Sequence, residues 1–146
     1  MRSRAVWLLA LAACTSPDHC EGFVPTAELR VAGERFTLEI ADELDEQQLG
    51  LMGRSELPAD GGMVFRWDDV AERSFYMKDT LIPLDLIAIE DDKVVSVASM
   101  VPCEQTPCIT TKTAPASEVV EINGGLAEEL GIEVGDRATI GDIGCG

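Results

Sequence analysis

Apolar and polar residues alternate along much of the chain, and this period of two predicts β-strands that each bury one face. Two segments instead carry apolar residues at helical spacing: one begins at Glu43 and ends near Gly53, and the other is Leu126 to Leu130, closed by Gly131. The predicted strands are residues 27–31, 34–40, 63–67, 84–90, 93–101, 117–123 and 137–140. A loop with three prolines, residues 102–115, follows the strand at 93–101.

About seven short strands with two brief helices predict a mainly β domain of the α+β class. An antiparallel sandwich or a distorted barrel would allow these strands to bury a common face. No internal repeat is visible, and 146 residues suit one core. We expect three parts: residues 1–13 as a signal, 14–26 as a tether and 27–146 as a single β-rich domain.

The stretch from Ser74 to Ile89 places charged and hydroxyl side chains between two apolar runs. If its first half is extended, Tyr76, Lys78 and Thr80 share one face of the strand. Pro83 lacks a backbone donor, so it predicts a bend or a strand break before the second apolar run.

Asp85 lies in that second run, on the same side as Ile87 and Ile89, so we expect it either at the edge of the sheet or buried. Burial of its carboxylate would require a cation or several donors, and Lys78 and Arg54 are the nearest cations in sequence. Cations beside hydroxyl groups suit a carboxylate, sugar or terminal peptide ligand. The predicted binding site consists of Arg54, Tyr76, Lys78, Thr80 and Asp85.

Two alternatives use the same residues. In the first, Lys78 or Arg54 neutralises Asp85 in a purely structural network. In the second, Asp85 works with Lys78 or Arg54 in a hydrolase. Nucleophilic catalysis finds little support, because the only histidine, His19, lies in the tether and no nucleotide or nucleophile-elbow motif occurs. We therefore favour a non-catalytic domain without a cofactor.

Three methionines offer a further alternative, since thioethers bind soft metals such as cuprous copper. Met52, Met63 and Met77 all lie in apolar surroundings and lack the close Met-x-Met or histidine spacing typical of such sites. Filling of the hydrophobic core is the simpler interpretation.

The N-terminus has the order of a bacterial lipoprotein signal. Two arginines precede an apolar segment, residues 5–13, and Cys14 follows as the residue that would accept lipid. Nine apolar residues are too few to cross a bilayer, which needs about 20 in a helix. Thr15 stands where an aspartate would retain a lipoprotein in the inner membrane, which indicates outer-membrane sorting in a Gram-negative cell. We expect an exported protein anchored to the envelope by lipid.

Acidic residues outnumber basic ones by 27 to 11, giving a formal net charge of −16. Such a surface repels phosphate backbones and anionic headgroups, so we expect no nucleic-acid partner and membrane attachment through lipid alone. The expected partner is an envelope protein or a small ligand.

Once Cys14 is assigned to lipid, four cysteines remain in an oxidising compartment, and four cysteines allow three pairings. Cys103 and Cys108 flank a short loop and most simply pair with one another. Cys20 and Cys145 would then join the two ends of the domain. A structural role is the expected one, because redox pairs usually have the closer Cys-x-x-Cys spacing.

The order of several motifs resembles the domain of unknown function 192 family over roughly residues 27–140. The motifs are residues 48–54, 62–65, 74–89, 119–125 and 131–136. The resemblance implies a small, mainly β, sandwich-like domain that is often exported and has no established activity. The chain departs from the family pattern at Tyr76, where tryptophan is usual, at Asp79, where asparagine is usual, and after Cys108, where a tyrosine is expected.

Overall fold

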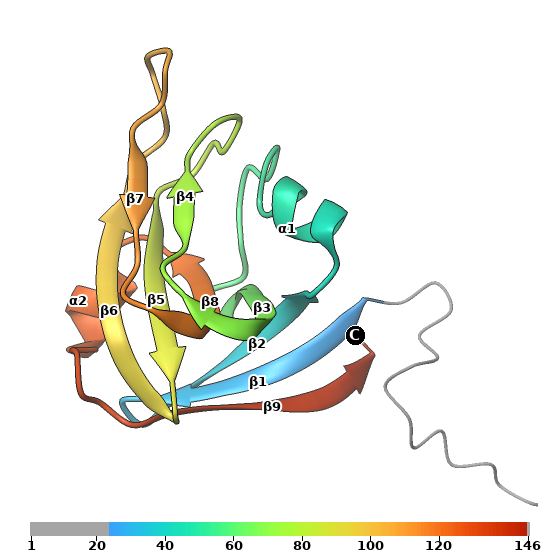
Figure 1. Ribbon diagram of the computed structural model, residues 1–146, viewed down its shortest axis with the longest axis vertical. Helices are drawn as coiled ribbons and strands as arrows, with labels where there is room; N and C mark the ends of the chain where they lie inside the picture. Colours follow the sequence, from blue (N-terminus) through green and yellow to red (C-terminus); the bar gives the residue numbers. More distant parts are fainter. Residues whose placement is uncertain (1–23, 146) are drawn as a thin grey trace, which may run out of the picture.

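The computed structural model describes residues 24–145, which form a mostly β domain with two short helices (Figure 1). The strands are β1 Pro25–Val31, β2 Glu34–Ala41, β3 Gly61–Ala71, β4 Ser74–Tyr76, β5 Leu84–Glu90, β6 Lys93–Met100, β7 Thr110–Lys112, β8 Ala116–Asn123 and β9 Ala138–Cys145. The helices are α1 Leu44–Leu49 and α2 Leu126–Leu130. These elements confirm the predicted fold class.

Seven strands form one mixed sheet in the order β6-β5-β8-β3-β2-β1-β9. All neighbouring pairs are antiparallel except β2 and β3, which are parallel because α1 and its following loop return the chain to the same edge. The other two strands, β4 and β7, form a small separate sheet beside the long loop.

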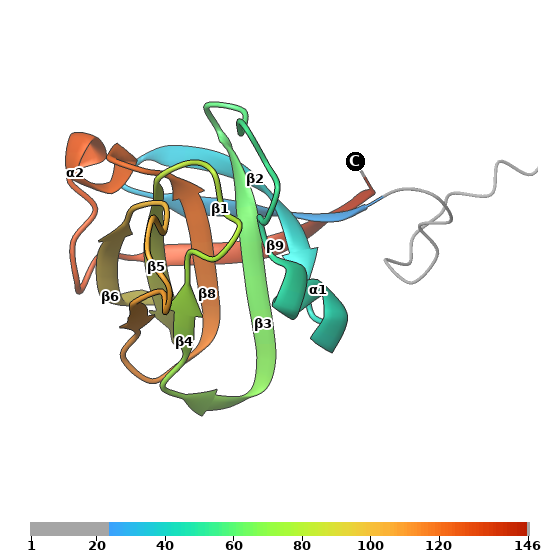
Figure 2. The ribbon, with the colours of Figure 1, turned by 90° about the horizontal axis from the view of Figure 1, so that it is seen from above.

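The large sheet curls until its two edges approach, without closing into a barrel (Figure 2). The start of β9 contacts the turn between β5 and β6. Lys93 and Arg137 form an isolated antiparallel β-bridge through their backbones, and the Ala138 N–H donates to the Asp92 carbonyl at 2.9 Å. Asp91 and Asp92 both have positive φ in that turn, as the predicted turn requires. The curl encloses one side of the sheet and leaves the other to be covered by loops.

Two hydrophobic clusters therefore lie on opposite faces of the sheet. Inside the curl, residues such as Leu38, Ile87 and Val120 pack with Ala127 of α2. On the outer face, a second cluster is covered by α1, β4 and the loops around them; its buried members are Ala41, Leu51, Met63, Phe65, Met77, Leu84, Leu86, Ala88, Met100, Ala116 and Val119. The central strands β3, β5 and β8 contribute to both clusters.

Several predicted boundaries differ from the structure. The first helix ends at Leu49, with Gly50 as its C-cap, instead of near Gly53. Strand β3 runs on to Ala71, which pairs with Ala116 of β8 beyond an irregularity after Arg66. The extended stretch after Ser74 stops at Tyr76, since a turn follows in which the Thr80 N–H donates to the Met77 carbonyl. Strand β7 was not predicted, because three residues carry too weak a pattern.

Neither helix in the described range has the length and apolar character needed to cross a membrane.

Gly62 of β3 lies opposite Ile122 of β8 and is tightly packed. A Cβ built at this position would lie 2.3 Å from the Glu121 carbonyl oxygen, far inside van der Waals contact. We expect Gly62→Ala to lower the free energy of unfolding by roughly 1 to 3 kcal/mol, because the strands must shift apart. Urea unfolding measures this loss, and Gly141→Ala on β9 is the control, since a Cβ there meets no atom within 4 Å. Equal effects of the two substitutions would contradict the close packing.

Candidate functional site

Among residues 24–145, a cavity of about 150 Å³ lies between the outer face of the sheet, α1 and β4. Aromatic rings from β3 and β4 form its walls: Phe65, Trp67 and Phe75. Leu49 of α1 is 61% exposed and Tyr76 of β4 is 46% exposed, so these two side chains mark its rim. The space is smaller than a pocket for a drug-sized ligand, and it suits a small molecule or one group of a larger one.

The three rings contact one another and so hold the wall rigid. The centroids of Phe65 and Phe75 are 5.2 Å apart at an interplanar angle of 82°, and those of Trp67 and Phe75 are 6.4 Å apart at 83°. Edge-to-face pairs of this kind are favourable because the positive ring edge meets the negative face of the partner. Phe65 is buried, while the other two rings are partly exposed.

Glu121 is the ionisable group in the wall that lies deepest. It lies on β8 between Met63 of β3 and Leu86 of β5, facing the outer cluster, and is only 6% exposed. Its carboxyl makes no hydrogen bond or ion pair with another residue of the 24–145 range. Burial among apolar neighbours raises the pKa of Glu121 to about 8, because the charged form loses its hydration.

Arg73 contributes a second unusual group to the cavity wall. Its guanidinium lies over the Trp67 ring, with Cζ 4.3 Å from the ring centroid, and its Nη2 donates to Asp69 Oδ1 at 2.8 Å. Its Nε–H is buried and has no hydrogen-bond partner within the described part of the chain. Buried polar groups are nearly always hydrogen-bonded, so unpaired ones beside a cavity indicate a binding function.

Glutamine side chains from α1 complete the polar part of the wall. Gln47 donates from Nε2 to the Arg66 carbonyl at 2.7 Å, which joins the helix to β3. The helix begins with a capping box between Glu43 and Glu46. The turn after it is fixed to the loop after β4, because the Gly53 N–H donates to the Asp79 carbonyl at 2.8 Å. The two segments that close the cavity are thus tied to each other.

The residues of the predicted binding site divide between the two faces of the sheet. Tyr76 and Thr80 line the cavity. Arg54 lies beside the same loop but forms a bidentate pair with Glu39 of β2, with N···O distances of 2.8 and 2.7 Å. This pair raises the pKa of Arg54, since Glu39 favours the charged guanidinium. Strand spacing places Glu39 roughly 10 Å from Glu121, two strands away.

Asp85 is not part of this group, which corrects the predicted site. It faces the interior of the curl, is fully buried, and accepts from Ser99 Oγ at 2.7 Å and from the Ala127 N–H at 2.8 Å. It thus caps α2, whose own first residues offer no side-chain cap. Lys78 and Arg54 do not pair with it, so the hydrolase alternative has no geometric support.

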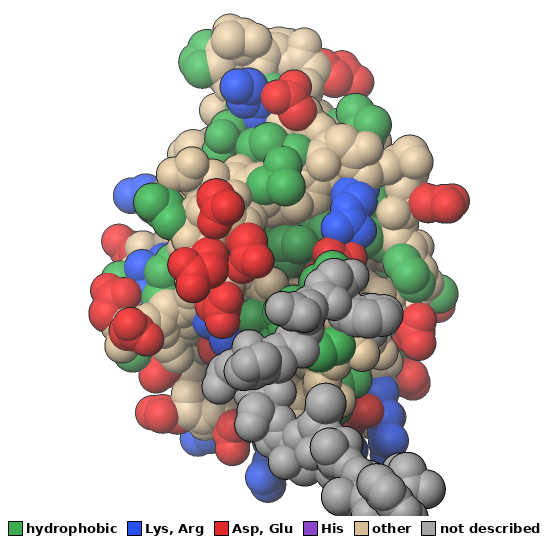
Figure 3. All heavy atoms as spheres, turned by 90° about the vertical axis from the view of Figure 1, so that its right-hand side faces the viewer, with side chains coloured by type: hydrophobic (Ala, Val, Ile, Leu, Met, Phe, Trp, Pro, Cys, Tyr) green, Lys and Arg blue, Asp and Glu red, His purple; other side chains and the backbone are tan. Residues whose placement is uncertain are grey.

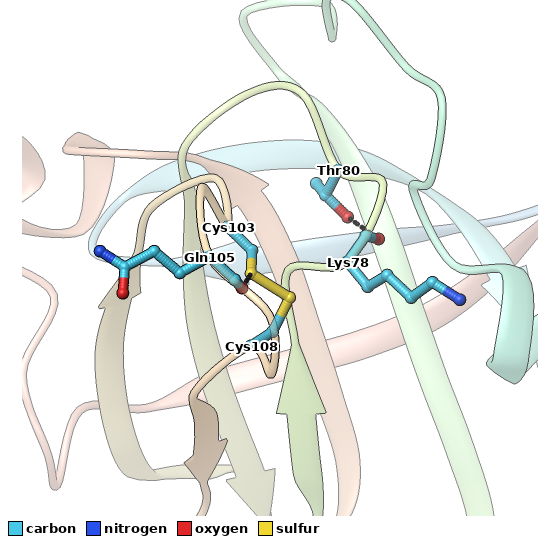
Figure 4. The surroundings of a disulfide bond; sticks show 5 residues. All are labelled: Lys78, Thr80, Cys103, Gln105 and Cys108. Atoms are coloured by element: carbon cyan, nitrogen blue, oxygen red, sulfur yellow. Dashed lines mark hydrogen bonds between the residues drawn. A yellow bond between two sulfur atoms is a disulfide. The ribbon is translucent and has the colours of Figure 1, made fainter.

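Lys78 is exposed, and its side chain extends away from the nearby disulfide (Figure 4). The disulfide joins Cys103 and Cys108, which confirms this predicted pairing. The predicted partner of Cys145, Cys20, lies outside the described residues, as do Cys14 and the rest of the signal and tether up to residue 23.

Met63 and Met77 belong to the outer hydrophobic cluster, and Met52 lines the cavity. Within the described range, no cluster of three or more histidine, cysteine, aspartate or glutamate side chains could hold a metal ion.

A larger hollow of about 630 Å³ lies beside the disulfide loop, next to Met77 and Ile109. Its acidic lining residue, Glu104, is exposed, and no buried ionisable side chain in the described range lines it. The smaller cavity is therefore the stronger candidate for a site.

Sequence reasoning missed Glu121, Arg73 and the three rings. The sequence does contain a signal for Glu121, because this residue follows the apolar Val119 by two positions and so lies on the same buried face of the strand. The cavity itself has no sequence signature, since its walls come from segments that meet only in the fold.

Known proteins share this fold. The model of the DUF192 family, described as "Uncharacterized ACR", matches residues 27–140. A solved structure of a protein of unknown function from Novosphingobium aromaticivorans DSM 12444 is 34% identical, with a TM-score of 0.68; the alignment covers 93% of this chain and 99% of that one. A second, from Sinorhizobium meliloti 1021 and provisionally described as a transcription regulator, is 28% identical with a TM-score of 0.67, over 79% and 92% of the two chains. No curated protein matches.

Replacing the Glu121 carboxyl by an amide tests its buried, protonated state. In the folded chain this carboxyl keeps its proton up to about pH 8, whereas the unfolded chain loses it near 4.5. The unfolded state therefore binds fewer protons between these values, and stability falls as pH rises. We expect Glu121→Gln to exceed the parent by less than about 1 kcal/mol at pH 5 and by about 4 kcal/mol at pH 8.

Denaturant unfolding at the two pH values measures this difference. Glu56→Gln is the control, because Glu56 is exposed and its substitution should leave the pH dependence unchanged. A constant difference between Glu121→Gln and the parent from pH 5 to pH 8 would contradict the raised pKa.

Proposed function

Because the chain belongs to the DUF192 family, for which no reaction is described, we propose a function from the site alone: non-catalytic binding of a small ligand in the cavity above Glu121. The observation that carries this proposal is a buried carboxyl that faces a cavity and has no partner among residues 24–145. Desolvating such a group costs folding free energy, and a bound ligand would recover it by pairing with the group.

The aromatic wall supports the same function. Rigid rings offer apolar contact area at little entropic cost, and Gln47, Thr80 and Arg73 add polar groups that can orient a ligand. Catalysis has no comparable support, because no nucleophile with an adjacent base is found in the described range.

We further propose that the domain acts at the bacterial envelope, held there by lipid on Cys14 and sorted to the outer membrane in a Gram-negative cell. The Sinorhizobium protein is described as a transcription regulator. A net charge of −16 opposes contact with a phosphate backbone, so the proposed partner is a small molecule and not a nucleic acid.

Blocking the cavity tests ligand binding. Ser74 is exposed on β4 and lines the cavity, so a phenylalanine there can enter the space without disturbing the core. In a ligand-detected NMR screen of small fragments that represent cationic, neutral and anionic classes, we expect binders whose signals disappear with Ser74→Phe. Ser55→Phe, an exposed serine outside the cavity, should retain them. A screen without binders, or binders that Ser74→Phe leaves unaffected, would contradict the proposal.

The lipid anchor is tested separately by metabolic labelling with palmitate. We expect the parent chain to incorporate label and to sediment with membranes, and Cys14→Ala to do neither, because the signal places the lipid on Cys14. Thr15→Ala is the control and should remain labelled. Label on the Cys14→Ala chain would remove the proposed location.

A further inference from the structure

We propose that the ligand of this cavity is a small organic cation, with a substituted ammonium group held between the aromatic rings and the carboxylate of Glu121. This inference rests on the proposed function and specifies the chemical class of its ligand.

The rings are the first feature that favours a cation. Phe65, Trp67 and Phe75 are in mutual contact and all line the space, so a group that enters it meets several ring edges and faces. Substituted ammonium groups bind well to such surfaces, because ring faces are negative and because the methyl groups lose little hydration. The face of Trp67 is occupied in this way by the Arg73 guanidinium, so the ligand would contact chiefly Phe65 and Phe75.

The charge of the cavity wall is the second feature. Glu121 is the one carboxyl among the lining residues described, and its neighbours Met63 and Leu86 are neutral. The other ionisable lining groups are Tyr76 at the rim and Arg73, whose Nη2 is paired with Asp69 while its buried Nε–H has no partner in the described range. A carboxylate without a partner in an apolar site is strongly stabilised by a cation that brings no water with it.

The charged groups farther from Glu121 either have an ion-pair partner or lie in solvent. On the same sheet face, Glu39 is neutralised by Arg54. Lys78 and Asp79, in the loop after β4, are both exposed and do not line the cavity. None of these groups supplies Glu121 with a counterion, so its charge is left for the ligand.

The charge of the protein surface on the side of α1 favours the same class. The first turn of α1 carries Asp45 and Glu46, and its C-terminal residues line the cavity. The side of the molecule shown in Figure 3, which is the side of α1 in Figure 1, carries a group of acidic side chains. With a net charge of −16, the protein attracts cations toward this face and repels anions.

Binding of a cation must be linked to release of a proton. Burial raises the pKa of Glu121 to about 8, so the free protein holds this residue as a neutral acid below that pH. When a substituted ammonium ion binds, the carboxyl releases its proton to solvent and a carboxylate–ammonium pair remains. Cation affinity should therefore rise about tenfold per pH unit up to pH 8 and level off above it. A neutral ligand that accepts a hydrogen bond from the acid would show the opposite trend.

Matched probes test the charge class directly. Choline carries a trimethylammonium group, and 3,3-dimethylbutan-1-ol has the same shape without the charge. We expect isothermal titration calorimetry of the full chain to give a choline affinity that is tens of fold higher at pH 9 than at pH 6. The neutral analogue should bind at least tenfold more weakly at pH 9. Glu121→Gln, which is expected to fold more stably than the parent, should lose the preference for choline and its pH dependence.

The outcomes separate this inference from the proposed function. If the neutral analogue binds as well as choline and Ser74→Phe abolishes both, the cavity is a binding site but the cation class is overturned. The cation class is also overturned if choline affinity is independent of pH or unchanged in Glu121→Gln. If neither probe binds and the fragment screen also finds nothing, the proposed function fails with it.

Discussion

Burial of the central strands on both faces is the constraint on which the structure depends. Every residue of β5 from Leu84 to Ile89 is buried, and β8 beside it is buried through most of its length. In such strands no side chain can turn to water, so each polar residue must find a partner inside the protein or remain unsatisfied. Asp85 and Glu121 are the two buried carboxyl groups of these strands, and their surroundings in the fold differ.

Asp85 is satisfied, and the result is structural. Its two hydrogen bonds tie β6 and α2 to β5, and they substitute for the missing side-chain cap of a five-residue helix. Gly124, which precedes this helix, is packed so closely that a Cβ would lie 2.8 Å from Pro83. The proline bend and the carboxylate after it therefore position α2 over the inner core, and a ligand role for Asp85 is not needed to explain it.

Glu121 is not satisfied, and the protein bears a folding cost at neutral pH as a result. Such costs persist mainly where they serve a function, because removing the carboxyl would be a simple route to higher stability. The surrounding structure leaves a cavity beside this buried group: α1 and the loop after β4 are joined by the hydrogen bond from Gly53 to Asp79, and the aromatic rings line the cavity. The site is thus preorganised before any ligand arrives.

The sequence determined the seven strands of the large sheet, both helices, the turn at Asp91 and Asp92, and the Cys103–Cys108 pairing, because these follow from local periodicity, turn chemistry and short spacing. It left Asp85 either at the edge of the sheet or buried, and the structure shows that it is buried. Only the tertiary structure shows which partner each charged group has. Arg54 forms an ion pair with Glu39, Asp85 accepts a hydrogen bond from the start of α2, and Glu121 lines a cavity. The parallel pairing of β2 with β3 and the curl of the sheet decided this, because they set which residues from distant segments share a face, and no local pattern encodes that arrangement.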